Sequence, residues 1–148
     1  MCSTGIRISE LQYITVEAAK KGEVTVTCKG KIRKVFILPA LRKKLLDYAK
    51  KQEIRSGMIF VTKNQRPLDR SNIWREMKGI CHQAGVSAKK VFPHNLRHLF
   101  ARTFYVFEKD MAKLADILGH SNINTTRIYI RTTGAEHRCR MERMHLII

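Results

Sequence analysis

Apolar and polar positions alternate over residues 24–28, where Val-Thr-Val-Thr-Cys has the two-residue period of a half-buried strand. Residues 32–38 are again rich in β-branched and apolar side chains, and the short turn Lys29-Gly30-Lys31 separates the two segments. Together they predict an antiparallel β-hairpin over about residues 23–38 with lysines at its tip. Residues 58–61 predict a further short extended segment.

Most other apolar residues recur with the three-to-four-residue spacing of amphipathic helices. Pro39 fits the first position of one helix, and Pro93 introduces another over about residues 94–105. Ser71 and Asp110 fit the N-caps of two more. The positions expected on buried helix faces are Leu41, Leu45 and Tyr48; Ile73, Met77, Ile80, Cys81 and Ala84; and Met111, Leu114, Ala115 and Leu118.

Two further helices are expected near the ends of the chain. Ser9 fits the N-cap of a short helix that begins at Glu10, which places Arg7 at the turn before it. Residues 133–136, Thr-Gly-Ala-Glu, have the capping-box pattern that starts a helix. The predicted fold is therefore α+β: mainly α-helical, with a small antiparallel sheet.

Length and composition predict one domain over residues 1–148. The 148 residues are 44% hydrophobic, enough for one core, and the three prolines mark no internal linker. The four cysteines are scattered without a CxxC pair, which favours free thiols in a cytoplasmic protein over disulfides or a metal site. No apolar stretch approaches the roughly 20 residues that span a bilayer, so no membrane association is expected.

The charge changes this picture of an ordinary small domain. Lys and Arg number 29 against 12 acidic residues, which gives a formal charge of +17 and an isoelectric point near 10.2. Such an excess predicts a polyanionic partner. The alternative is a uniformly solvated basic surface, but many of the cations lie beside histidine and tyrosine instead of in separate runs.

The segment His94-Asn95-Leu96-Arg97-His98 is the first candidate site. His94 and Arg97 are three residues apart and so share a helix face, which suits a phosphate site. A zinc helix of the metalloprotease type needs glutamate directly after the first histidine, and Asn95 stands there. His98 is expected to be a structural histidine, turned away from Arg97.

Three segments resemble the signature boxes of the tyrosine recombinase (phage integrase) family, in the family's order: STGIRISEL at residues 3–11, HNLRH at residues 94–98 and ILGHSNINTTRIYI at residues 117–130. The resemblance implies the catalytic-domain fold of that family, no cofactor and no metal. The alternative for Tyr129, within Arg-Ile-Tyr-Ile, is a core tyrosine in a buried strand.

Carried over residue by residue, the resemblance implies catalytic roles for Arg7, Lys29, His94, Arg97, His120 and Tyr129. Tyr129 would be the nucleophile and the two arginines would bind the phosphate. His94 would accept or share the tyrosine proton, and His120 would donate to a phosphate oxygen. Lys29 would be the general acid, but the hairpin turn is one residue shorter than usual, so Lys31 stays an alternative. Glu10 matches an acid expected to brace the basic side chains.

These residue types suit attack on a DNA phosphate. Deprotonating a phenol near neutral pH costs about 4 kcal/mol, which fixed positive charge lowers. Two guanidinium groups can bind non-bridging oxygens while charge builds up in the transition state. The implied function is site-specific recombination through a covalent 3′-phosphotyrosine.

The expected partner is double-stranded DNA. Lys31, Arg70, Arg75 and Lys78 are candidate DNA-binding residues, the last three near Trp74, although a solvated helix face explains those three equally well. The resemblance also implies a homo-tetramer on DNA for the full-length protein. Because family members carry further helices and a DNA-clamping domain before the first arginine box, we expect an N-terminally truncated catalytic domain.

Two other functions fit the same residue types. One is a type IB topoisomerase, which nicks and reseals one strand without exchanging partners. The other is a DNA-binding module that has the fold but no catalysis. The short distance from the Leu-Gly-His segment to Tyr129 favours the recombinase over the topoisomerase.

Overall fold

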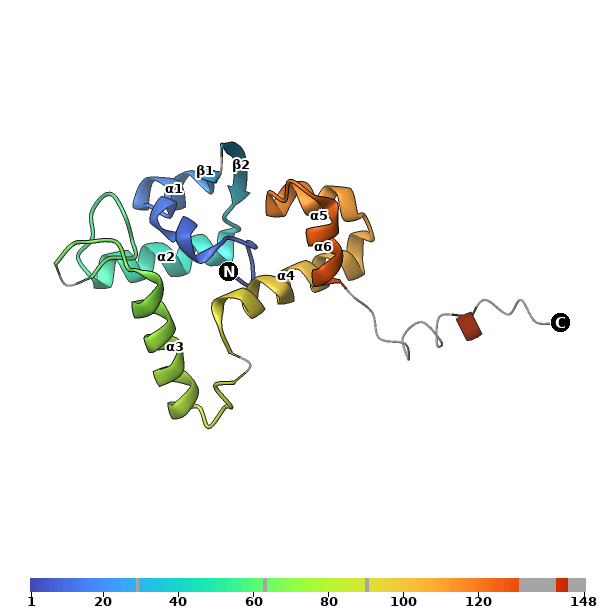
Figure 1. Ribbon diagram of the computed structural model, residues 1–148. Helices are drawn as coiled ribbons and strands as arrows, with labels where there is room; N and C mark the ends of the chain where they lie inside the picture. Colours follow the sequence, from blue (N-terminus) through green and yellow to red (C-terminus); the bar gives the residue numbers. More distant parts are fainter. Residues whose placement is uncertain (29, 63, 90, 131–140, 144–148) are drawn as a thin grey trace.

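The computed structural model describes residues 1–28, 30–62, 64–89, 91–130 and 141–143, with only the backbone at Cys28 and Lys31 (Figure 1). The elements of these ranges are η1 (Ile8–Tyr13, a 3-10 helix), α1 (Val16–Lys21), β1 (Glu23–Cys28), β2 (Lys31–Phe36), α2 (Pro39–Lys51), α3 (Arg70–Gln83), α4 (Pro93–Glu108), α5 (Met111–Leu118) and α6 (Ile123–Tyr129). The mainly helical α+β class is confirmed.

The first core lies between the hairpin and the helices around it. Strands β1 and β2 pair antiparallel, from Glu23 opposite Phe36 to Cys28 opposite Lys31. The inward positions Val26 and Val35 are buried. They pack in one cluster with Ile6, Leu45 of α2 and other apolar residues of η1 and α1. The predicted hairpin and the Pro39 helix are therefore confirmed.

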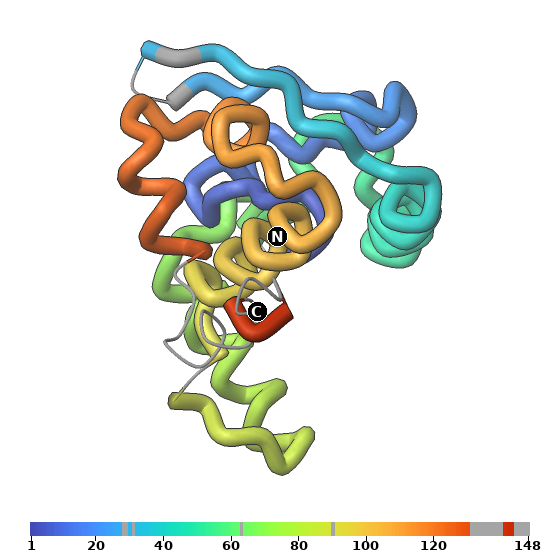
Figure 2. The backbone as a smooth tube through the Cα atoms, turned by 90° about the vertical axis from the view of Figure 1, so that its right-hand side faces the viewer, coloured from blue at the N-terminus to red at the C-terminus, as the bar shows by residue number. Residues whose placement is uncertain are grey.

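The second core joins α4, α5 and α6. Ala101, Leu114, Leu118 and Tyr129 form its buried cluster. Asp110 caps α5 as predicted, because its carboxylate accepts a hydrogen bond from the backbone N–H of Lys113 at 2.9 Å. The hairpin lies along α5, so that β2 connects the first core to the second (Figure 2).

Helix α3 departs from the sequence prediction. Its N-cap is Asp69, whose carboxylate accepts from the backbone N–H of Asn72 at 2.7 Å, and not Ser71. Of the stripe expected to be buried, only Cys81 is; Ile80 is 64% exposed. The helix extends away from the two cores in both views, so little of the described chain covers it (Figures 1 and 2). Amphipathic spacing predicts which residues form the apolar face of a helix, but it does not show which other element packs against that face.

Several smaller differences have local causes. η1 begins at Ile8 with Arg7 at its N-cap, so Ser9 lies inside the helix and does not cap it. Tyr48 of α2 is 43% exposed, because Leu45 and Ala49 form the buried face. Residues 58–61 form only isolated bridges, from Met58 and Val61. Apart from residues 141–143, the helix predicted from residue 133 lies outside the described residues.

Helices α1 and α6 were not predicted. α6 begins after Asn122, whose side chain accepts from the backbone N–H of Asn124 at 2.8 Å. Tyr129 is the last residue of α6, so the strand expected in the alternative interpretation is wrong, although Tyr129 is a buried core residue as that alternative expected.

Candidate active site

Arg7 is fixed by Glu10, one turn later in η1. The backbone N–H of Arg7 donates to Glu10 Oε2 at 2.8 Å, and Arg7 Nη1 donates to Glu10 Oε1 at 3.0 Å. Arg7 Nη2 donates to the carbonyl oxygen of Gly119 at 3.1 Å. The side chain stays 28% exposed. Arg7 thus connects η1 to the end of α5 while part of it remains open to solvent.

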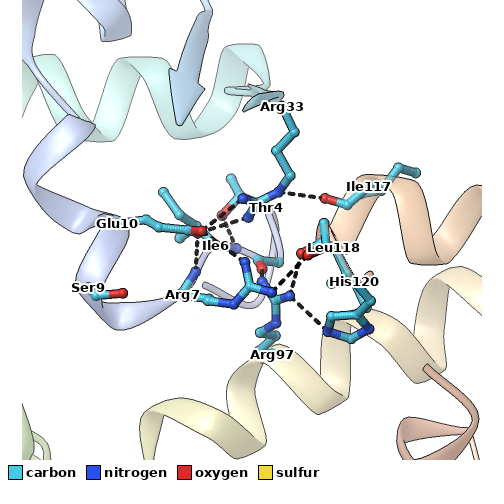
Figure 3. A network of polar contacts seen from close by, with 12 residues as sticks. Thr4, Ile6, Arg7, Ser9, Glu10, Arg33, Arg97, Ile117, Leu118 and His120 are labelled. Carbon is cyan, nitrogen blue, oxygen red and sulfur yellow. Dashed lines mark hydrogen bonds and ion pairs between the residues drawn. The ribbon is translucent and has the colours of Figure 1, made fainter. Parts of the chain in front are cut away.

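Arg33 reaches the same carboxylate from β2 (Figure 3). Its Nη1 and Nη2 each donate to one oxygen of Glu10 at 2.8 Å, and its Nε donates to the carbonyl oxygen of Ile117 at 2.9 Å. It also passes over Gly119, where an added Cβ would come within 2.9 Å of Arg33 Cδ. Arg33 was not predicted from the sequence as a residue of the site. The sequence signal for its role was its position on the same strand face as the inward-pointing Val35.

Glu10 is the acidic centre of this network. It is buried, and burial alone would raise the pKa of its carboxyl group. Hydrogen bonds from Arg33 and from the backbone of Arg7 outweigh that effect and lower the pKa to about 2. The bracing role expected of Glu10 fits this geometry, since one carboxylate holds two guanidinium groups in place.

Replacing Arg33 by glutamine is expected to lower the free energy of unfolding by about 3–5 kcal/mol, because it leaves the Glu10 carboxylate buried with half of its ion pairs removed. The neighbouring Lys34, 62% exposed at its side chain, is the matched control. Lys34→Gln should leave stability nearly unchanged. Urea unfolding measures both variants, and equal stability of the two would contradict the assigned role of Arg33.

Arg97 is almost completely buried in α4, at 3% exposure. Its Nη1 donates to the carbonyl oxygen of Gly5, and its Nη2 donates to the carbonyl oxygen of Leu118 at 2.6 Å. Burial, and then the positive charge of Arg7, lower the pKa of Arg97 to about 10, so the group remains charged at neutral pH. Arg97 is therefore a fixed cation between residues 5–7 and the end of α5.

His120 follows the helix stop at Gly119, as predicted. Its Nε2 lies 3.1 Å from Arg97 Nη2, and its Nδ1 lies 2.9 Å from Thr126 Oγ1. Because an arginine can only donate, Nε2 accepts and Nδ1 carries the ring proton. Burial, followed by the charges of Arg97 and Arg7, lowers the pKa of His120 to about 4. Neutral His120 thus orients Arg97, and donation to a phosphate oxygen would require the other tautomer.

The titration of His120 follows from these contacts. We expect the His120 ring to stay neutral from pH 8 to pH 5 and to gain its proton near pH 4. The unfolded chain binds that proton near pH 6.5, so stability is expected to fall as the pH drops from about 6.5 to 4. Imidazole NMR spectra against pH measure the titration. A His120 midpoint at or above 6.5 would contradict the buried, neutral ring.

Three histidine rings surround Tyr129, which is 7% exposed. The ring centroids of His98, His120 and His94 lie 3.9, 5.2 and 5.4 Å from that of Tyr129. From the sequence, His98 was expected to have only a structural role, yet its ring is the nearest of the three to Tyr129. Its position four residues after His94, on the same helix face, was the available signal.

A cavity of about 560 Å³ opens beside these groups, lined by η1, the start of α3 and the start of α4. Arg7, His94, Arg97 and Tyr129 line it, whereas His120 lies behind Arg97. The structure therefore brings together five of the six predicted catalytic residues. Lys29, the sixth, lies outside the described residues.

The predicted DNA-binding residues lie at different places in the structure. Arg70 lines the cavity, and Arg75 lines a separate surface hollow beside it. Lys78 Nζ lies 4.9 Å from the centroid of the Trp74 ring and donates to the carbonyl oxygen of Ala88. Only the backbone of Lys31 is described.

No group of three or more His, Cys, Asp or Glu side chains in the described ranges could hold a metal ion. None of the helices described here is long and apolar enough to cross a membrane.

Two arginines, a histidine and a tyrosine thus line one cavity of a mainly helical fold, a set of groups suited to attack on a phosphate. Residues 1–136 match the phage integrase family, and the chain belongs to that family. The tyrosine recombinase XerA of Pyrococcus furiosus is 33% identical over 97% of this chain and 52% of its own length. XerD of Oceanobacillus iheyensis is 32% identical over 90% of this chain and 48% of its own length.

Solved structures agree with this assignment. The crystal structure of XerA recombinase superposes with a TM-score of 0.80 at 27% identity, over 99% of this chain and 55% of the other. XerH recombinase bound to palindromic difH substrate matches with a TM-score of 0.73 at 25% identity, over 95% of this chain and 42% of the other. The chain has the tyrosine recombinase catalytic-domain fold, and it spans about half the length of these relatives.

Proposed function

We propose that the chain catalyses site-specific cleavage and rejoining of DNA strands through a covalent 3′-phosphotyrosine, with residues 1–148 acting as one catalytic domain. The position of Tyr129 is the observation that carries the proposal. Its ring lies among three histidine rings, at a cavity also lined by Arg7 and Arg97. The relatives are named tyrosine recombinases, which fits this chemistry.

In the first step Tyr129 Oη attacks the phosphorus and the bond to the 5′ oxygen breaks. One DNA end is then joined to Tyr129, and the other leaves as a 5′-hydroxyl after taking up a proton. His94 accepts the phenol proton. Burial, then the charges of Arg97 and Arg70, lower the pKa of His94, which keeps its ring neutral and able to accept. Attack by a 5′-hydroxyl of another strand reverses the step, so no external energy source is needed.

The arginines stabilise the charge that builds up on the phosphate. Arg7 is exposed enough to contact non-bridging oxygens directly. Arg97 directs both Nη groups to carbonyl oxygens and His120, so it acts chiefly as a fixed positive charge beside the phosphate. His120 is then a positioning residue for Arg97.

We propose double-stranded DNA as the partner and a homo-tetramer as the assembly on it. The charge of +17 supports the first part, as do the XerH and Tn1549 integrase structures solved with DNA. The second part follows from the chemistry, because exchange between two duplexes requires four cleavages and each needs its own tyrosine.

Covalent capture tests this proposal. We would incubate the chain with duplexes of randomised sequence that carry a nick, so that the short cleaved fragment diffuses away and the adduct accumulates. A protein–DNA adduct on a denaturing gel is expected. No adduct despite DNA binding would indicate a module without catalysis. Adducts that never give Holliday junctions would indicate nicking and resealing of the topoisomerase type.

Lys29 is the proposed general acid and Lys31 is the alternative, and a substrate with a bridging sulfur distinguishes them. A bridging 5′ sulfur leaves without a proton because a thiol pKa is about 8.5, whereas the oxygen of an alcohol needs one. We expect Lys29→Ala to cleave the nicked duplex with an ordinary 5′ oxygen slowly. The same variant should cleave the duplex with a bridging 5′ sulfur almost as fast as the unmodified protein does. Arg97→Ala should cleave both substrates slowly, because the phosphate charge must be neutralised in either case. Rescue seen only for Lys31→Ala would move the role to Lys31.

A further inference from the structure

The ring of His98 is a common neighbour of Tyr129 and His94. Its centroid lies 3.9 Å from that of Tyr129 and 4.5 Å from that of His94, whereas the centroids of His94 and Tyr129 lie 5.4 Å apart. The two histidines are four residues apart in α4, so their side chains lie on the same face of the helix. The His98 ring is therefore closer to each of the other two rings than they are to each other.

The contact between His98 and Tyr129 is a close packing contact. Aromatic pairs in proteins usually have centroids about 4.5–7 Å apart, so a separation of 3.9 Å places these two rings in van der Waals contact. Burial, more than the nearby positive charges, lowers the pKa of His98, so its ring is neutral at pH 7. A neutral, flat ring thus packs against the phenol ring of Tyr129.

His98 is placed to act on the other two residues and not on a substrate. Among the described residues, Tyr129 and His94 line the active-site cavity and His98 does not. A phosphate in the cavity can contact the phenol oxygen of Tyr129 and the ring of His94. His98 can influence that phosphate only through these two side chains.

The position of Tyr129 in the chain explains why its ring needs such a contact. Tyr129 is the last residue of α6, and Ile130 is the C-cap of that helix. Attack requires the reacting atoms to lie about 3–3.5 Å apart and in line. The phenol oxygen is at the far end of the side chain, so rotation about the Cα–Cβ bond would move it away from a phosphate. A ring packed against the phenol restricts that rotation.

We propose that His98 is a positioning residue, which holds the rings of Tyr129 and His94 in their relative arrangement by packing and not by proton transfer. The proposal rests on the proposed function, since it names a residue on which the placement of the nucleophile depends. The flat ring at position 98 is then required for fast cleavage, and its two nitrogens are not.

Two variants of His98 separate the ring from its nitrogens. His98→Ala removes the ring, and alanine keeps α4 helical. We expect adduct formation on nicked duplexes at saturating DNA to be about 10²-fold slower, the usual effect of misplacing a reacting group by about 1 Å, with DNA affinity changed less than about twofold. His98→Phe keeps a flat ring without nitrogens and should restore the rate to within about fivefold of the unmodified chain.

Phe104 provides the matched control. It also belongs to α4 and packs against the second core, and its ring pairs with that of Phe100. Phe104→Leu removes a ring from this core and should leave the rate at saturating DNA within about threefold. Equal losses of rate in Phe104→Leu and His98→Ala would mean that any change in the core slows cleavage. Equal losses in His98→Phe and His98→Ala would mean that the nitrogens are needed. Either result would overturn the proposal.

NMR measures the positioning of Tyr129 without DNA. The couplings between the Hα and Hβ protons of Tyr129 should report one rotamer in the unmodified chain and in His98→Phe, and rotamer averaging in His98→Ala. If adducts form but Tyr129 keeps one rotamer in His98→Ala, the positioning role is wrong and the cleavage chemistry stands. If His98→Ala frees the ring but the unmodified chain forms no adduct on any nicked duplex, the positioning contact stands and the proposed chemistry is wrong.

Discussion

Replacing Tyr129 by phenylalanine is expected to lower the rate of covalent adduct formation with DNA by a factor on the order of 10⁴ or more. The affinity for DNA should change less than about twofold. The substitution removes only the phenol oxygen. The ring that packs against His94, His98 and His120 is kept, and so is the buried position in the second core. The fold and the basic surface are therefore unchanged, and the nucleophile alone is lost.

Tyr105 provides the matched control. It packs against the same core from α4 but does not line the active-site cavity. Tyr105→Phe should keep adduct formation near the level of the unmodified chain. Adducts are measured on denaturing gels and DNA affinity by fluorescence anisotropy. An adduct that persists in Tyr129→Phe would show that another group attacks the phosphate.

The second large effect concerns salt. With a charge of +17, we expect affinity for unrelated duplexes to fall by about 10³–10⁵ between 50 and 200 mM salt if six to ten phosphates are contacted. Cations that bind phosphates release condensed counterions, and added salt opposes that release. Anisotropy titrations at several salt concentrations measure the slope. A flat response would show that the basic surface does not bind the DNA backbone.

The features that local sequence signals determine were predicted well. Helix α5 begins after the Asp110 cap and ends at Gly119, and Leu114, Ala115 and Leu118 form its buried face. The hairpin follows from the alternation on either side of the Gly30 turn. In these elements the capping residue, the turn glycine and the apolar period all point to one structure.

Features that depend on tertiary contacts were not predicted. Arg33 is separated from Ile117 by more than half of the chain, so no local pattern shows that it closes on Glu10 and the end of α5. The apolar stripe of α3 has the right period but is only partly covered: Ile80 is 64% exposed. The structure brings the motif residues Arg7, Arg97 and Tyr129 to one cavity, whereas the donor direction of His120 depends on its contacts with Arg97 and Thr126.

The central claim is that Tyr129 forms the covalent bond to DNA, and peptide mapping of the captured adduct tests it most directly. The adduct would be digested with nuclease and trypsin, and the modified peptide sequenced by mass spectrometry. We expect a nucleotide remnant on Tyr129 alone among the four tyrosines of the chain. A remnant on Tyr13, Tyr48 or Tyr105, or on a residue of another type, would contradict the account.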